Sequence, residues 1–273
     1  MNETLRIVDG RTELRMERRL SHPPAKVWRA ITQPQHLGQW FPAQVRLELR
    51  AGAEIGFDTG DGYQADGAVI EVDEPRVFAF SWGGDLLRWE IRPDGAGSQL
   101  VLTHTLDDHY GAGSFAAGWE TCVDGLEQVL AGEPVSTPGP SAERLEEFIA
   151  AFGLADGVVE NGTLRFERQL SQPTDAVWAL LTGDNLPAVG AAPPAATVIA
   201  GGPAGPVTAV TAPRLLEYDG VRWELRDGTG HGARLVLTRP APADPDAALT
   251  ATKDHLDRLA AQVAAGSPHR AGV

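Results

Sequence analysis

The feature that most constrains the fold of this chain is an internal repeat. Residues 14–32 read LRMERRLSHPPAKVWRAIT and residues 164–182 read LRFERQLSQPTDAVWALLT, with ten of the nineteen positions identical. Further matches follow in the same order, LRWEIR at 87–92 with VRWELR at 221–226 and LVLT at 100–103 with 235–238. Ordered matches over such distances predict a duplicated domain rather than an array of short repeats.

The two copies differ in length. Trp28 and Trp89 are 61 residues apart, whereas their counterparts Trp178 and Trp223 are only 45 apart. The shortening falls between residues 183 and 211, a stretch rich in alanine, glycine and proline that lacks the strand patterns of the first copy. We therefore expect the second copy to have lost one or two strands.

The first copy contains patterns typical of strands and patterns typical of helices. A period-two pattern at 14–20 predicts a strand. Ser21 is expected to cap a short helix with Val27, Trp28 and Ile31 on its apolar face, and a second short helix starts at Pro34. About six strands with hairpin-like turns follow, and helical spacing of apolar residues predicts one long helix over 114–130. Because an antiparallel sheet has one face to bury, the long helix should cover it.

These patterns predict an α+β protein made of two helix-grip domains. Each domain is a curved antiparallel sheet wrapped around a long C-terminal helix, and the second has fewer strands. A proline-rich linker is expected to end in a short helix capped by Ser141 and terminated at Gly153. The predicted parts are a complete domain at 1–132, the linker and its helix at 133–153, and a degenerate domain at 154–267.

Composition limits the classes of function. The net charge of −14 argues against nucleic acid and against an anionic membrane surface as partners. One cysteine excludes an intramolecular disulfide and a cysteine-rich metal site, and no apolar stretch is long enough to span a membrane. We expect a cytoplasmic protein. No dinucleotide, P-loop or metalloprotease motif is present, so neither a cofactor nor a metal is expected.

The first copy resembles the SRPBCC or START-like superfamily, and within it the homologues of the activator of the heat-shock protein 90 ATPase. The residues that carry the resemblance are VWRAIT at 27–32, His36-Leu37 with Trp40, Gly67 with EVDEPR at 71–76, Phe80 with Trp82, LVLTH at 100–104, and Gly118-Trp119 with Leu126. The resemblance implies a cavity between sheet and long helix that receives apolar small molecules. It also implies that some relatives are enzymes and that the namesake regulates a chaperone.

Six residues are the candidate ligand-binding set. They share an expected position facing the predicted cavity, and they are Trp40, Phe80, Trp82, His104, Phe115 and Trp119. His104 alternates with Leu100 and Leu102, so its side chain should point inward and could act as a general acid or base. The alternative for His104 is a hydrogen-bonded core histidine, and the aromatic residues could equally fill the core.

Other polar groups are weaker candidates. The segment Asp107-Asp108-His109-Tyr110 could hold a polar group at the cavity mouth, but turn and capping roles are favoured. Cys122 is expected to be a buried structural thiol. Among Glu48, Asp58 and Asp66, two carboxylates could converge as an acid/base pair, although solvated positions are favoured.

Three functions follow from this reading. The favoured one is binding of an apolar or aromatic small molecule in the first copy, with the second copy as a structural or interaction surface. The second is an enzyme of the cyclase or hydrolase type that uses the same cavity, with His104 as acid/base. The third is a protein-interaction or chaperone-regulating role. The sequence identifies neither the ligand nor the packing of the two copies.

Overall fold

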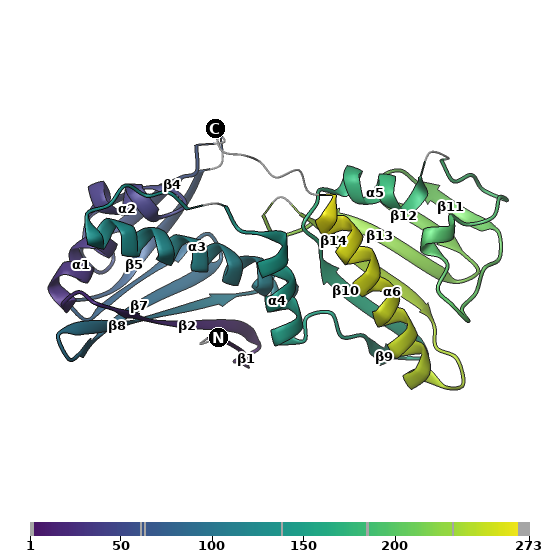
Figure 1. The fold of residues 1–273 in the computed structure, drawn as a ribbon, viewed down its shortest axis with the longest axis horizontal. Helices are drawn as coiled ribbons and strands as arrows, with labels where there is room; N and C mark the ends of the chain where they lie inside the picture. The colour runs from purple at the N-terminus through teal and green to yellow at the C-terminus, as the bar shows by residue number, and fades with distance from the viewer. Residues whose placement is uncertain are drawn as a thin grey trace. The chain divides into compact units, whose positions relative to one another are not determined.

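A computed structural model describes residues 3–60, 62, 64–137, 139–183, 186–230 and 232–266. The chain divides into two compact units, Met1–Pro140 and Ser141–Val273. Each unit contains one antiparallel sheet and one long helix that lies across it (Figure 1). We call them the first and the second domain. The α+β fold with two helix-grip domains, expected from the sequence, is confirmed.

The first domain has an eight-stranded sheet with the order β1-β2-β8-β7-β6-β5-β4-β3. Its elements are β1 (Thr4–Val8), β2 (Arg11–Leu20), α1 (Pro24–Thr32), α2 (Pro34–Trp40), β3 (Gln44–Leu47), β4 (Glu54–Asp58), β5 (Gln64–Asp73), β6 (Val77–Trp82), β7 (Asp85–Asp94), β8 (Gly97–Leu106), the 3-10 turn η1 (His109–Gly111) and α3 (Ala112–Ala131). All neighbouring strands are antiparallel, and the six strands expected after the short helices are β3 to β8.

Two details of the first domain differ from expectation. Helix α1 begins after Pro23 without a side-chain cap, so Ser21 is not its N-cap. The paired prolines already fix the backbone for the first helical turn, and the helix therefore starts at Pro24. Strand β1 was not predicted. It is joined to β2 by Asp9 and Gly10, both with positive φ, which is the arrangement of a tight hairpin.

The second domain repeats this order with two strands fewer. Its six-stranded sheet has the order β11-β12-β13-β14-β10-β9. The elements are α4 (Ala142–Phe152), β9 (Val158–Glu160), β10 (Thr163–Gln169), α5 (Thr174–Thr182), the 3-10 turn η2 (Ala195–Thr197), β11 (Val207–Thr211), β12 (Leu215–Tyr218), β13 (Val221–Asp227), β14 (Ala233–Pro240) and α6 (Pro245–Ala265). Strands β9 and β10 correspond to β1 and β2, and β11 to β14 correspond to β5 to β8. Within the described residues the second domain has no counterparts of α2, β3 and β4, and the loss of two strands is the one that the shortened interval predicted.

Helix α4, which the sequence assigned to the linker, lies within the second unit. Its cap is the expected one, because Ser141 Oγ accepts a hydrogen bond from the Arg144 backbone N–H at 3.1 Å. The helix ends at Gly153 in the left-handed conformation, where glycine has no steric cost.

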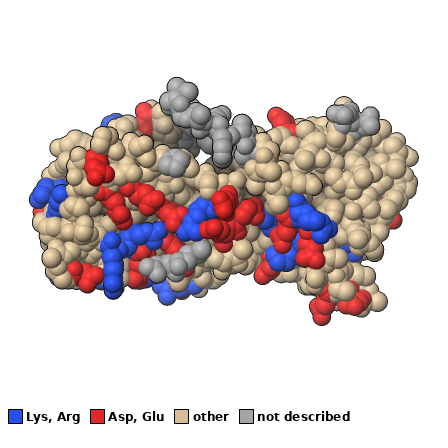
Figure 2. Space-filling view, viewed as in Figure 1, with Lys and Arg blue, Asp and Glu red and all other residues tan. Residues whose placement is uncertain are grey.

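The core of each domain lies between its sheet and its long helix. Trp89 and Trp223 occupy matching positions and are both about 1% exposed, so this tryptophan packs the core in both domains. On the face shown in Figure 2, acidic and basic side chains are interspersed rather than separated into patches of one sign. None of the described helices is both long and apolar enough to cross a membrane.

Candidate functional site

The six predicted ligand-binding residues lie in one continuous cluster of rings in the first domain. Trp40 and Trp119 both contact Trp89 edge to face, with 5.7 Å between ring centroids. Trp119 also contacts His104, whose ring lies 4.6 Å from that of Phe115. The six residues thus share one cluster, and their role in ligand binding stays a prediction.

Two phenylalanines outside the predicted set complete the cluster. Phe41 contacts Trp119 and Trp82 at 5.7 and 5.4 Å. Phe57 stacks on Trp82 at 4.7 Å and contacts Phe80 at 5.6 Å. The alternation of Ile55 with Phe57 in its strand was the signal that could have identified Phe57.

Packing within the cluster leaves its rings in contact with one another. Trp40, Phe80 and Trp119 are buried, whereas Trp82 and Phe115 are partly exposed. Trp40 is further anchored because its indole Nε1 donates a hydrogen bond to the Ala30 carbonyl at 3.0 Å. Neither of the two cavities described below is lined by these residues.

His104 is held by hydrogen bonds on both sides of its ring. It lies on β8 and is 2% exposed, so the predicted inward orientation is confirmed. Trp119 Nε1 donates to His104 Nδ1 at 3.0 Å, and His104 Nε2 lies 3.0 Å from Asp85 Oδ2. An indole N–H can only donate, so Nδ1 must carry a lone pair and Nε2 must carry the proton. The chain Trp119–His104–Asp85 therefore fixes one neutral tautomer.

This arrangement restricts what His104 can do chemically. A general base needs a free lone pair that faces the substrate proton. The only lone pair of His104 accepts the Trp119 N–H, and its only N–H points to the Asp85 carboxylate. The geometry is that of a hydrogen-bonded core histidine.

The segment after β8 has turn and capping roles. Asp108 Oδ1 accepts a hydrogen bond from the Gly111 backbone N–H at 3.2 Å, which caps η1. Asp107 pairs with Arg11 at 2.6 Å, and His109 Nδ1 lies 3.1 Å from the Thr12 hydroxyl. Among the residues that the structure describes, no group of three or more His, Cys, Asp or Glu side chains could hold a metal ion.

Cys122 on α3 is unsuited to act as a nucleophile. Burial raises the pKa of its thiol to about 12. The thiol is therefore protonated near neutral pH, and the thiolate required for nucleophilic attack is scarce.

A cleft of about 540 Å³ lies between β2 and the C-terminal half of α3. Its lining residues are mostly polar, and they are Arg19, Leu20, Ser21, His22, Asp124, Glu127, Gln128, Ala131 and Glu133. This volume falls within the range of about 300–1,000 Å³ that is usual for small-molecule sites. The cleft is thus between sheet and long helix, but it is away from the ring cluster.

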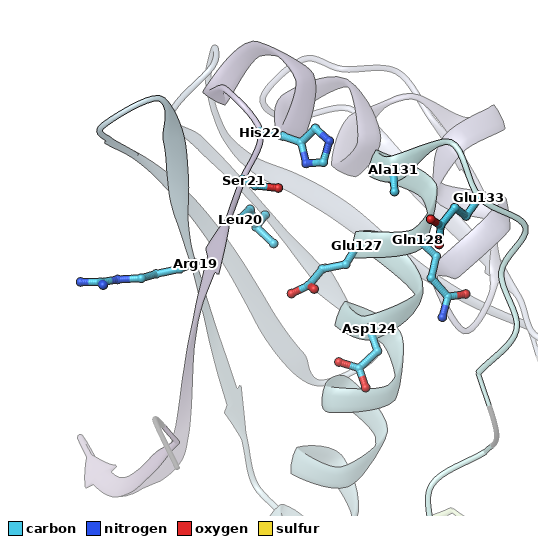
Figure 3. Close-up of a pocket in the computed structure, with 9 residues that line it drawn as sticks. All are labelled: Arg19, Leu20, Ser21, His22, Asp124, Glu127, Gln128, Ala131 and Glu133. Atoms are coloured by element: carbon cyan, nitrogen blue, oxygen red, sulfur yellow. The ribbon is translucent and has the colours of Figure 1, made fainter.

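The cleft is acidic. Figure 3 shows the carboxylates of Asp124 and Glu127 pointing from α3 toward β2, whereas Arg19 extends away from the cleft. Arg19 is 85% exposed and lies 3.4 Å from Asp94. Burial raises the pKa of Glu127, and the neighbouring Asp124 raises it further. Both carboxylates are exposed at the cleft, and the nearby Arg18 and His22 partly offset the rise in the pKa of Glu127.

A smaller cavity of about 360 Å³ lies against β3, β4 and β5. It is lined by Glu48, Asp66 and Arg46 among others, whereas Asp58 is not part of the lining. Arg50 donates a hydrogen bond to Glu48 and lowers the pKa of that carboxyl. Two of the three scattered carboxylates thus share one cavity, and at least one of them is held in its charged form.

The first domain can now be compared with known families. Residues 21–131 match the family model described as activator of Hsp90 ATPase homolog 1-like protein. The match covers 111 of the 273 residues, all within the first domain, so the similarity to this family is that of the first domain. The match runs from Ser21, just after β2, to Ala131, the last residue of α3, and so includes the ring cluster and part of the cleft lining.

Three solved structures illustrate what this chain is similar to. CalU16 from Micromonospora echinospora is 23% identical, with 55% of this chain and 93% of that chain covered and a TM-score of 0.46. A protein from Mesorhizobium loti is 23% identical, with 44% and 97% covered and a TM-score of 0.42. DynU16, a protein in the dynemicin biosynthetic locus, is 18% identical, with 93% and 97% covered and a TM-score of 0.44. The comparison with curated proteins gives no match.

Proposed function

We propose that the first domain binds a small organic cation in the cleft between β2 and α3. The observation that carries this proposal is a cleft of about 540 Å³ into which Asp124 and Glu127 project while Arg19 points away. Leu20 and Ala131 supply apolar contacts within the same lining. A molecule with a protonated amine and a short apolar or aromatic body matches both properties.

This proposal modifies the ligand expected from the sequence. An apolar or aromatic molecule was expected among the six inward residues, but their rings already pack against one another or against Phe41, Phe57 and Trp89. The cyclase or hydrolase alternative relies on His104, whose two ring nitrogens are both engaged. These contacts favour binding in the cleft over catalysis in the cluster. The protein-interaction alternative stays a prediction of the sequence.

The proposal can be tested by titrating the full chain with benzylamine and with its neutral analogue benzyl alcohol. Backbone amide NMR shifts locate each probe. We expect saturable shifts with benzylamine at residues 19–22 and 124–133, and weaker ones with benzyl alcohol. Loss of one charge-assisted contact in Glu127→Gln should weaken benzylamine binding about tenfold.

Glu74→Gln is the matched control, because Glu74 is an exposed glutamate in the β5–β6 turn and does not line the cleft. It should leave the affinity unchanged. Equal binding of benzyl alcohol, equal binding by Glu127→Gln, or shifts confined to another region would each refute the proposal.

A further inference from the structure

We propose that the second domain contains a binding site for a small organic carboxylate, centred on Arg239 at the end of β14. The site lies on the face of the sheet that α6 covers, and it is independent of the cleft in the first domain. The starting point is a buried cation that no carboxylate of the described residues neutralises.

Arg239 differs from the other buried arginines of its domain. Arg168 contacts the carboxylates of Glu146 and Asp257, and Arg234 contacts Glu167. Arg239 is only 4% exposed, yet within the described residues no carboxylate forms an ion pair with it. A buried guanidinium keeps its charge, so it requires an anion to compensate for the loss of solvation.

The hydrogen-bonding capacity of Arg239 is also largely unused. Its one side-chain partner in the described part of the chain is the Thr252 hydroxyl on α6, 3.4 Å from Nη1. Its Nε is buried and has no hydrogen-bond partner there. A guanidinium presents paired N–H groups in a plane, which is the arrangement that binds a carboxylate through two parallel hydrogen bonds.

A second donor lies on the same face of the sheet. Trp223 pairs in register with Leu237, two residues before Arg239, and its buried indole Nε1 has no hydrogen-bond partner within the described residues. Burial raises the pKa of the Tyr218 hydroxyl, whereas the neighbouring Trp223, Thr197 and Arg239 lower it, so this hydroxyl also lies close to the site. The unused polar atoms of Arg239 and Trp223 are thus donors, and they call for a ligand that accepts hydrogen bonds.

The surroundings restrict the ligand to a small monoanion with an apolar body. Leu164 pairs with Arg239 in register and is fully buried, as is Leu237. On the other side, Gly202 lies so close that a Cβ atom there would be 3.0 Å from Arg239 Nη1. One guanidinium among apolar walls compensates a single negative charge, and a dianion would need further cations.

The test uses the full chain labelled with 15N and follows the Nε–H resonance of Arg239. Formate, acetate and benzoate are the probes, benzamide is the neutral analogue of benzoate, and ionic strength is held constant with sodium chloride. We expect at least one carboxylate to shift this resonance in a saturable manner while benzamide does not. Thermal unfolding should show a matching rise in melting temperature.

Three variants make the outcome decisive. Arg239→Met removes the charge and should weaken binding about tenfold or more, measured through the melting temperature. Arg239→Lys keeps the charge but loses the planar pair of donors, and it should bind with intermediate affinity. Arg258→Met, at an exposed arginine on α6, is the matched control and should bind as the unmodified chain does.

The proposal is overturned if none of the three carboxylates gives a saturable response, or if benzamide and benzoate act alike. Undiminished binding by Arg239→Met overturns it as well. If Arg239→Met fails to fold, Arg239→Lys decides, because full affinity in that variant contradicts a site that depends on the guanidinium geometry.

Discussion

His104 in the first domain and Arg239 in the second occupy the same position of the fold. His104 pairs in register with Leu14 and Arg239 pairs with Leu164, and these two leucines open the repeated segments. His104 is enclosed by hydrogen bonds to Trp119 and Asp85, whereas in the described part of the chain Arg239 has one long side-chain hydrogen bond and its Nε has no partner. The same backbone position thus holds a satisfied polar group in one domain and an unsatisfied cation in the other.

The difference arises from the partners that the rest of each domain supplies. In the first domain α3 provides a tryptophan N–H and the start of β7 provides the Asp85 carboxylate. The repeat places Asp219 at the position of Asp85, but its carboxylate accepts a hydrogen bond from the Gly205 backbone N–H at 3.3 Å instead. Helix α6 contributes only the hydroxyl of Thr252. Duplication therefore preserved the strand positions while the surrounding partners changed.

The largest effect is expected from the helix residues that cover these two positions. Trp119→Ala removes a buried ring and the donor to His104, and it should lower the free energy of unfolding of the first domain by about 3–5 kcal/mol. Thr252→Ala removes the weak hydrogen bond from Arg239 and the one that the hydroxyl donates to the Ala248 carbonyl, and it should cost the second domain about 1 kcal/mol. Hydrogen exchange read separately on peptides of each domain measures both values.

Trp119→Phe is the control for the first of these values, because it keeps most of the ring and loses the N–H. It should retain much of the stability that Trp119→Ala loses. Similar costs for Trp119→Ala and Thr252→Ala would show that the two helices contribute equally, and the contrast between the domains would fail.

A smaller effect, of opposite sign in the two domains, is expected at the paired strand positions themselves. His104→Leu leaves the Trp119 N–H and the Asp85 carboxylate without their partner and should destabilise the first domain by about 1–3 kcal/mol. Arg239→Met removes a buried charge that has no ion-pair partner among the described residues. It should leave the stability unchanged or raise it by about 1 kcal/mol.

Chemical denaturation at constant salt, with a probe in each domain, measures both variants. Arg168→Met is the control, because it breaks an existing contact with Glu146 and Asp257 and should destabilise the second domain. Destabilisation by Arg239→Met to a similar extent would indicate that Arg239 is already neutralised within the chain. Turnover that depends on His104 without any change in stability would support the catalytic alternative instead.

Much of the fold could be predicted because repeats and alternation are local signals. The matched segments located both domains, and the interval between Trp178 and Trp223 located the missing strands. The hairpin of β1 was not predicted, nor was that of β9, which turns at Asn161 and Gly162 with positive φ. Asx-Gly pairs of this kind are a known hairpin signal, so both hairpins could have been found.

The candidate site was less predictable because it depends on contacts between distant residues. Alternation placed His104 inward, but it could not show that Trp119 and Asp85 would occupy both of its nitrogens. The acidic cleft brings Leu20 on β2 together with Glu127 on α3, more than a hundred residues later in the chain. Helical spacing identifies the buried face of α3, and Glu127 lies outside that face, so its place at a cleft required the folded structure.

The cleft itself offers a second contrast between the domains. Arg19 at the end of β2 corresponds in the repeat to Gln169 at the end of β10. Arg19 is directed to solvent, whereas Gln169 is 1% exposed and accepts hydrogen bonds from Arg234 Nε and the Thr229 backbone N–H, both at 3.1 Å. The end of β2 beside the cleft is thus open to solvent, whereas the neutral side chain of Gln169 fills the corresponding position at the end of β10.

The smallest expected effect is the pH dependence that Glu127 contributes to the first domain. Burial and Asp124 raise the pKa of Glu127 in the folded state above its ordinary value of 4.5, so the folded domain holds the proton more tightly than the unfolded chain does. The resulting stabilisation is present below pH 4.5 and is lost as the pH rises through the raised pKa.

Benzylamine, which remains protonated over this range, has the opposite dependence because its binding requires ionised Glu127. Its affinity should therefore fall on acidification with a midpoint above 4.5. Glu127→Gln should remove the contribution of Glu127 to the pH dependence of stability and of benzylamine affinity. Gln169→Glu places a carboxylate at the end of β10 and tests whether it creates the same two dependences in the second domain. A midpoint at or below 4.5, or the same midpoint in Glu127→Gln, would show that Glu127 does not control the cleft.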